Sequence, residues 1–290
     1  MALISADELA GRLDADPGSL RIADVRWYLK RPGDGRAAYA AGHIPGAIFV
    51  DLDDDLSDLD GLGSPGRHPL PSPAAFARTM GSLGIGSDHF VVAYDDAGGT
   101  IAARLWWMLD NLGHPGGVAV LDGGIGAWAA AGRPLSQSEP SYPPAELELA
   151  DTWTNVIERD ELAASLGTLT LLDARAPERY RGEVEPIDPA MGHIPTALSA
   201  PTTDNLAPDG RLQAAAELRS RYSAMTDGRP VVTYCGSGTS ACHNSLAMRI
   251  AGLPDPILYV GSFSDWSRTG MPVVTGAETD PVLSAQRRER

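Results

Sequence analysis

The chain has 290 residues, 43% of them hydrophobic, and its 32 Gly and 23 Pro make up about a fifth of it, where roughly 12% is typical. This composition indicates one large or two ordinary globular domains with many turns, and it excludes a disordered or fibrous chain. The formal net charge of −15 disfavours nucleic acid and anionic membranes as partners, since both are bound by a basic face.

The amino-terminal segment, MALISADELAGRLDADP, has neither a basic start nor a long apolar run, so we predict no signal peptide. No stretch of the sequence approaches the roughly 18 unbroken apolar residues of a transmembrane helix. The two cysteines, Cys235 and Cys242, are too few for a disulfide framework and lack the spacing of a zinc site. We therefore expect a cytoplasmic protein with reduced cysteines and no bound metal.

Short apolar runs alternate with helical segments along the chain. Residues 19–24, 90–94 and 118–122 are predicted to be buried strands, and residues 101–112 and 240–251 are predicted to be helices. Such alternation predicts an α/β fold in which a mostly parallel sheet is flanked by helices. In such a fold, catalytic residues are expected at the carboxyl ends of the strands.

The two halves of the chain repeat each other. The matching pairs, in the same order along both halves, are 22–26 with 171–175, 42–47 with 192–197, 91–95 with 231–235, and Trp128 with Trp266. We interpret the halves as two copies of one domain, residues 1–138 and 151–290, joined by a proline-rich linker at 139–150. The first copy carries about ten extra residues within the segment 51–71.

Cys235 stands at the end of a predicted strand, before a short loop and a helix that begins near Ser240. Gly236 and Gly238 allow successive backbone N–H groups to point into one concavity, and the amino end of the helix adds positive partial charge there. Both effects favour a thiolate over a thiol, so we predict that Cys235 is a nucleophile. Cys242 falls inside the helix and is predicted to be a packing residue.

Cysteine phosphatases use a similar strand, loop and helix, with an arginine six residues after the cysteine to hold the phosphate. Here that position is Ala241. A phosphate dianion would lack its planar cationic clamp, which disfavours this alternative.

The tandem copies, the paired Asp-x-Arg and Gly-His-Ile-Pro motifs and the single Cys-Gly-Ser-Gly loop resemble a two-domain rhodanese-type sulfurtransferase, over roughly residues 5–275. The resemblance implies that only the second copy is catalytic, because Asp95 stands in the first copy where Cys235 stands in the second. It implies that the thiolate takes the outer sulfur of a small anionic donor, becomes a persulfide, and passes the sulfur to cyanide, a thiol or a protein. No metal or organic cofactor is implied.

The loop Gly236-Ser237-Gly238 resembles that of the 3-mercaptopyruvate sulfurtransferases, whereas thiosulfate sulfurtransferases carry Arg-Lys in its place. A loop without cations favours a donor with less charge at its sulfur end. With Thr239 and Ser240, which replace the usual Val-Thr of the family, the loop is expected to cradle the donor. Thiosulfate remains an alternative donor, and a sulfur-carrier or thiol-sensing module with little turnover remains an alternative function.

The resemblance also implies an Asp–His–Ser relay of Asp53, His68 and Ser237, for which the extra segment of the first copy would reach the Cys235 loop. The structural alternatives are an exposed loop histidine and a solvated run of aspartates. Two arginines would bind the donor carboxylate. Arg179 matches the first, the second position is Asp188, and Arg181 is the candidate replacement.

The motifs that both copies share are predicted to be structural, because a catalytic role would not be retained in a silent copy. These residues are Asp24, Arg26, Asp173 and Arg175, which are expected to form ion pairs, the turn histidines His43 and His193, and Trp128 and Trp266.

Overall fold

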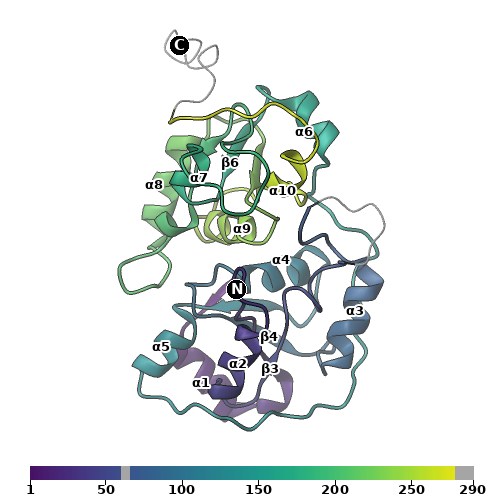
Figure 1. Cartoon of the computed structure of the whole chain (residues 1–290). Helices are drawn as coiled ribbons and strands as arrows, with labels where there is room; N and C mark the ends of the chain where they lie inside the picture. Colours follow the sequence, from purple (N-terminus) through teal and green to yellow (C-terminus); the bar gives the residue numbers. More distant parts are fainter. Residues whose placement is uncertain (60–65, 278–290) are drawn as a thin grey trace. The chain divides into compact units, whose positions relative to one another are not determined.

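The structure, a computed structural model, describes residues 1–59 and 66–277 and contains two compact units (Figure 1). The first unit comprises Met1–Leu59, Leu70–Thr154 and Leu206–Leu212. The second comprises residues 66–69, Asn155–Asn205 and 213–277 of the described chain. Each unit has an all-parallel sheet flanked by helices, which confirms the predicted α/β fold class.

The first unit is a five-stranded parallel sheet in the order β1-β5-β4-β2-β3. Its strands are β1 (Leu3–Ile4), β2 (Leu20–Asp24), β3 (Ala47–Phe49), β4 (Phe90–Tyr94) and β5 (Val118–Leu121). Its helices are α1 (Ala6–Ala15), η1 (Pro17–Ser19), α2 (Asp34–Ala41), α3 (Pro73–Ser82), α4 (Ala102–Asn111) and α5 (Gly124–Ala130). The three strands and the helix predicted in this half are confirmed, with ends that differ by at most one residue.

The second unit has four parallel strands in the order β7-β6-β8-β9. They are β6 (Thr170–Asp173), β7 (Leu198–Ser199), β8 (Val231–Tyr234) and β9 (Ile257–Leu258). The helices are α6 (Arg159–Ser165), α7 (Pro177–Tyr180), η2 (Thr202–Asn205), α8 (Ala215–Met225), α9 (Ala241–Ile250) and α10 (Ser262–Trp266). This strand order repeats β3-β2-β4-β5 of the first unit, as expected for a duplicated domain.

Both faces of the first sheet are buried. Val92 points to the face that packs on Leu9 of α1, while its neighbours Val91 and Ala93 are equally buried. Because crossovers between parallel strands are right-handed, α1 and α2 lie on one face of the sheet and α4 on the other, as Figure 1 shows. The strands are therefore continuous apolar runs rather than alternating ones.

The Asp-x-Arg motifs form buried, two-pronged ion pairs in both units. In the first, Arg26 Nη2 lies 2.6 Å from Asp24 Oδ2 and donates to the carbonyl of Gly42 at 2.8 Å. In the second, Arg175 makes the same 2.6 Å contact with Asp173 and donates to Gly192, also at 2.6 Å. Each pair therefore ties the end of a central strand to the turn that carries the Gly-His-Ile-Pro motif.

The histidines of those turns also have the structural role that was predicted. Nδ1 of His43 lies 2.9 Å from the carbonyl oxygen of Tyr39, and the two rings stack at 4.0 Å. His193 makes the corresponding contacts with Tyr180, at 2.7 Å and 3.8 Å. The tryptophans repeat as well, because the indole N–H of Trp128 donates to Pro134 and that of Trp266 to Pro272.

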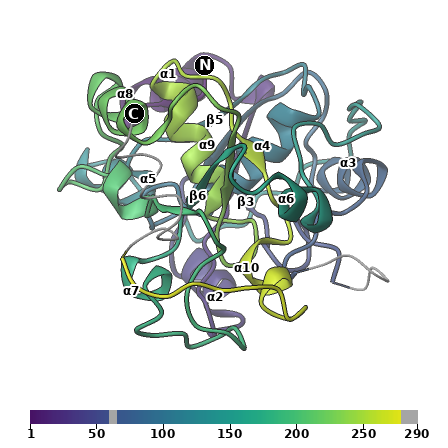
Figure 2. The same cartoon turned by 90° about the horizontal axis from the view of Figure 1, so that it is seen from above.

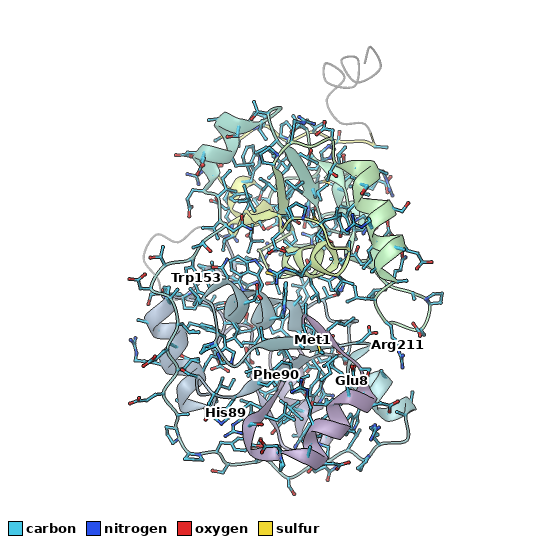
Figure 3. The ribbon with its side chains drawn as sticks, turned by 180° about the vertical axis from the view of Figure 1, so that it is seen from behind. Met1, Glu8, His89, Phe90, Trp153 and Arg211 are labelled. Atoms are coloured by element: carbon cyan, nitrogen blue, oxygen red, sulfur yellow. The ribbon has the colours of Figure 1, made fainter. Side chains whose placement is uncertain are left out.

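The predicted linker, residues 139–150, has neither helix nor strand and is hydrogen-bonded along the first unit. The Tyr142 hydroxyl donates to Gly46 at 3.0 Å, and the Ala145 N–H donates to Gly81 at 2.9 Å. Trp153, labelled in Figure 3, stacks on Trp107 at 5.8 Å and so attaches the end of this segment to the first unit. Among the described residues, no helix is both long and apolar enough to cross a membrane.

Replacing Arg175 with methionine is expected to lower the free energy of unfolding by about 3–5 kcal/mol, because it leaves the Asp173 carboxylate buried without its cation. The measurement is urea denaturation followed by circular dichroism. Arg229→Met, which removes an exposed partner of Asp227, is the control and should cost about 0–1 kcal/mol. Equal losses in the two variants would show that the buried pair is not a structural tie.

Candidate active site

Cys235 directly follows strand β8, and α9 begins six residues later; Figure 2 shows α9 beside the strands of the second unit. The cysteine is 1% exposed, and its Sγ accepts a hydrogen bond from the Ser237 N–H at 3.4 Å. Gly238 has φ +78°, and a methyl group there would come within 2.5 Å of the Val260 carbonyl oxygen. Only glycine fits this bend, which turns the loop around the sulfur.

The segment after β9 supports the Cys235 loop from behind. The Cys235 N–H donates to Ser262 Oγ at 3.1 Å, and the Phe263 N–H donates to the Cys235 carbonyl at 3.0 Å. The Ser264 N–H donates to the Gly236 carbonyl at 2.9 Å. Ser262 is fully buried with φ +54°, an uncommon conformation for a residue other than glycine.

Sequence reasoning missed these serines. The available signal was topological, since β9 is the parallel neighbour of β8 and the two strands end at the same edge of the sheet.

His68 belongs to the second unit and lies at the Cys235 loop. Its Nδ1 is 2.7 Å from Ser237 Oγ and 3.4 Å from Thr239 Oγ1, and the residue is only 6% exposed. The alternative of an exposed loop histidine is therefore wrong. A hydroxyl hydrogen-bonded to an imidazole can pass a proton to or from a reacting atom.

Asp53, the third member of the predicted relay, belongs to the first unit. Its Oδ2 accepts a hydrogen bond from the indole N–H of Trp27 at 2.8 Å, and its side chain is half-buried. Asp53 is thus a specific acceptor rather than one of a solvated run, while its place in the relay stays a prediction.

Two arginines lie over the Gly236 peptide. A methyl group at this glycine would come within 2.7 Å of Arg67 Nη2 and 3.5 Å of Arg179 Nη1. Arg179 was predicted to lie here. Arg67 was not predicted, although it directly precedes His68 in the sequence. Arg181 pairs instead with Glu183 at 2.7 Å, where both side chains are substantially exposed.

The two arginines share buried carboxylates. Asp188 pairs with Arg67 through Oδ1 and with Arg179 through Oδ2, the latter at 3.1 Å. Glu185 pairs with Arg179 at 2.8 Å. Burial raises the pKa of Asp188 despite the two guanidiniums. Burial also opposes ionisation of Glu185, but the hydrogen bonds from Arg179 and from backbone N–H groups hold the pKa of Glu185 below its usual range.

The first unit has the same strand, loop and helix, but an aspartate fills it. Asp95 Oδ1 accepts the N–H groups of Ala97 and Gly99, both at 2.8 Å. Oδ2 accepts those of Ile101 at 2.7 Å and Ala102 at 2.9 Å. Four N–H groups of this loop therefore converge on one carboxyl group, although burial raises the pKa of Asp95; the same convergence is predicted around Cys235.

Cys242, at the start of α9, is fully buried, and its Sγ donates to the Gly238 carbonyl at 3.3 Å. It packs beneath the loop, as predicted.

A buried cysteine in a loop that repeats the Asp95 loop, next to a hydroxyl–imidazole pair, is the arrangement expected of the predicted cysteine nucleophile. Both halves match the model of the rhodanese-like domain, at residues 5–131 and 158–269, so the chain belongs to the rhodanese family as a tandem-domain member. The predicted resemblance is confirmed.

Individual relatives cover nearly the whole chain. A Pseudomonas aeruginosa protein named "Probable 3-mercaptopyruvate sulfurtransferase" is 48% identical over 94% of this chain and 98% of its own. A thiosulfate sulfurtransferase from Bos taurus is 35% identical over 93% of each chain. The structure of a 3-mercaptopyruvate sulfurtransferase from Leishmania major matches with a TM-score of 0.81 and 32% identity, over 93% of this chain and 75% of that one.

Replacing Asp95 with asparagine is expected to lower the free energy of unfolding by about 3 kcal/mol, because an amide N–H₂ then faces backbone donors that lose their acceptor. Urea denaturation measures the change. Asp96→Asn is the matched control, since Asp96 is exposed and accepts one hydrogen bond from Tyr28. If Asp95→Asn proved as mild as this control, the loop would not depend on a carboxyl group at this position.

Proposed function

We propose that this chain is a sulfurtransferase that moves sulfur from 3-mercaptopyruvate to a thiophilic acceptor through a persulfide on Cys235. The observation that carries the proposal is the 2.7 Å contact between His68 Nδ1 and Ser237 Oγ, in the loop whose Ser237 N–H donates to the Cys235 sulfur. The 48% identity to the Pseudomonas aeruginosa relative supports it.

In the first half-reaction the Cys235 thiolate attacks the donor sulfur. A sulfur–sulfur bond forms, the carbon–sulfur bond of 3-mercaptopyruvate breaks, and its electron pair goes to the methylene carbon as the enolate of pyruvate. The donor thiol proton is transferred to that carbon, which gives pyruvate and a Cys235 persulfide anion. No external oxidant or reductant is required.

In the second half-reaction an acceptor attacks the outer sulfur of the persulfide. With cyanide, a carbon–sulfur bond forms, the sulfur–sulfur bond breaks, and thiocyanate leaves as its electron pair returns to Cys235. A small thiol or a protein thiol can accept the sulfur in the same way. We propose the cytoplasm as the compartment, in keeping with two cysteines that form no disulfide.

The side chains of the second unit have distinct roles in this scheme. Ser237 carries the proton between the donor thiol and the enolate, and His68 accepts and returns it through Nδ1. Asp53, in the first unit, is the third member of the relay that the resemblance implies. The N–H groups of 236–240 stabilise the sulfur anion, and Arg179 binds the donor carboxylate.

Charge favours the monoanionic donor over thiosulfate. The positive charges of Arg67 and Arg179 are balanced by Asp188 and Glu185, whose side chains are fully buried. The charges of this cluster already cancel, so the two negative charges of a dianion would be less well compensated there than the single charge of 3-mercaptopyruvate. Thiosulfate stays the second candidate donor because a relative of that name covers the same length of the chain.

Cys235→Ser is expected to abolish persulfide formation and turnover with every donor, because the nucleophile is lost. Mass spectrometry after incubation with donor should show one added sulfur on the parent protein and none on the variant. Cyanide should then release that sulfur as thiocyanate over many cycles. Cys242→Ala is the control and should keep the added sulfur. Activity that persists in Cys235→Ser would contradict the mechanism, and a persulfide without turnover would indicate a carrier.

Ser237→Ala is expected to lower kcat with 3-mercaptopyruvate about a hundredfold, because the enolate loses its proton donor. With thiosulfate, sulfite leaves without needing a proton, so the same variant should change little. Steady-state kinetics of both donors on both proteins make this comparison. Equal losses would mean that Ser237 only shapes the loop, and a large preference of the parent protein for thiosulfate would overturn the donor assignment.

A further inference from the structure

Arg179, the residue proposed to bind the donor carboxylate, already contacts two carboxylates of the protein. Its Nε and Nη2 donate to Glu185 at 2.8–3.1 Å, and its Nη2 also donates to Asp188 Oδ2 at 3.1 Å. Its other terminal nitrogen, Nη1, lies 3.5 Å from the position of a methyl group on Gly236, the residue after Cys235. A donor carboxylate that binds this guanidinium therefore becomes its third negative partner.

The charges around Arg179 are balanced within the protein. The two guanidiniums are those of Arg67 and Arg179, and the two carboxylates are Asp188, which contacts both of them, and Glu185. Both carboxylate side chains are fully buried, so water screens their charges poorly. A donor monoanion leaves this cluster with one negative charge in excess. Repulsion between carboxylates that share a buried site favours protonation of one of them.

Asp188 is the carboxylate that is easier to protonate. Its oxygens accept hydrogen bonds from Arg67 and Arg179, and no backbone N–H of the described residues donates to them. Burial raises the pKa of Asp188, although the two guanidiniums oppose this. Burial also opposes ionisation of Glu185, but hydrogen bonds from Arg179 and from the backbone N–H groups of Asp188 and Ile187 hold the pKa of Glu185 below its usual range. Glu185 therefore keeps its charge when a further anion binds.

We propose that Asp188 takes up one proton from the solvent when the donor binds, so that the donor carboxylate replaces the charge of Asp188 beside Arg179. The proposal rests on the proposed function. The charges then balance again, because Arg67 and Arg179 face one protein carboxylate and one donor carboxylate. Asp188 thereby becomes a determinant of specificity, since a monoanion requires one such proton and a dianion would require two.

The direction of the pH dependence follows from this coupling. The donor binds best at low pH, where Asp188 is already protonated. The affinity decreases as the pH rises through the range in which Asp188 titrates, by up to about tenfold per pH unit for one linked proton.

Other titratable groups lie close enough to be alternative proton acceptors. Arg175, which contacts Glu185 at 3.4 Å, is a guanidinium and stays protonated, as do the other two arginines. His68 contacts the Cys235 loop and would gain a positive charge, while a Cys235 thiolate would lose its negative charge. Either change would also accompany anion binding, so the experiment has to assign the proton to Asp188.

Pyruvate is the probe, because it carries the carboxylate of the donor but no thiol and cannot transfer sulfur to Cys235. Isothermal titration calorimetry in two buffers of different ionisation enthalpy gives the number of protons taken up per bound pyruvate, from about pH 5 to about pH 9. The parent protein is expected to take up close to one proton and to bind pyruvate more weakly as the pH rises. In Asp188→Asn both effects should disappear, and at high pH this variant should bind pyruvate about tenfold more tightly than the parent protein.

Glu183→Gln is the matched control. Glu183 lies on the same segment as Asp188, but its side chain is exposed and pairs with Arg181. This variant should keep the proton uptake and the pH dependence of the parent protein. Circular dichroism and the urea midpoint show whether Asp188→Asn is folded, and the proton uptake of the parent protein tests the proposal without any variant.

The role of Asp188 is overturned if the parent protein binds pyruvate without proton uptake throughout this pH range, or does not bind pyruvate at all. It is also overturned if folded Asp188→Asn takes up protons as the parent protein does, which would assign them to His68 or Cys235. Weaker binding to Asp188→Asn at every pH would mean that Asp188 only holds the guanidiniums in place. Failure of the proposed function has a different signature, because the parent protein would then gain no sulfur on Cys235 from 3-mercaptopyruvate.

Discussion

The constraint on which the site depends is that several backbone N–H groups in the turn between a parallel strand and the next helix point at one place. Buried donors of this kind need an acceptor. In the first unit the Asp95 carboxylate accepts four of them and closes the loop on itself. In the second unit the corresponding residue is Cys235, whose sulfur accepts a hydrogen bond from the Ser237 N–H. One substitution thus replaces a carboxylate that the loop surrounds with a thiol.

A net charge of −15 is compatible with an anionic donor because a small donor contacts only a few charged groups of the protein. The arginines beside Gly236 are balanced by Asp188 and Glu185, which are buried and face them directly. The protein as a whole repels polyanions, while one small region of the second unit offers oriented N–H groups and guanidinium forks. A small anion in this region would therefore meet these local groups rather than the net charge of the chain.

The sequence was sufficient for the strands, the principal helices and the position of the Cys235 loop, because buried apolar runs, a glycine-bounded loop and a repeated order of motifs are local signals. His68 could be placed at Ser237 only through the resemblance to a family. Ser262 and Arg67 were missed, since each contacts the Cys235 loop from a segment distant in sequence. Likewise, the boundary between the units after Thr154 depends on contacts such as the stacking of Trp153 on Trp107, and the composition of the linker does not predict such contacts.

Duplication explains why these missed residues matter. The Asp-x-Arg pairs and the turn histidines occur in both units, so they maintain the fold and cannot distinguish one unit from the other. The two loops differ at one position of the repeat, where Asp95 stands in the first unit and Cys235 in the second. The Cys235 loop is also contacted by Arg67 and His68, which come from the first half of the sequence but belong to the second unit. The second unit, which contains Cys235, is therefore completed by residues from the half of the chain that has Asp95 at the corresponding position, and the second half of the sequence alone would lack them.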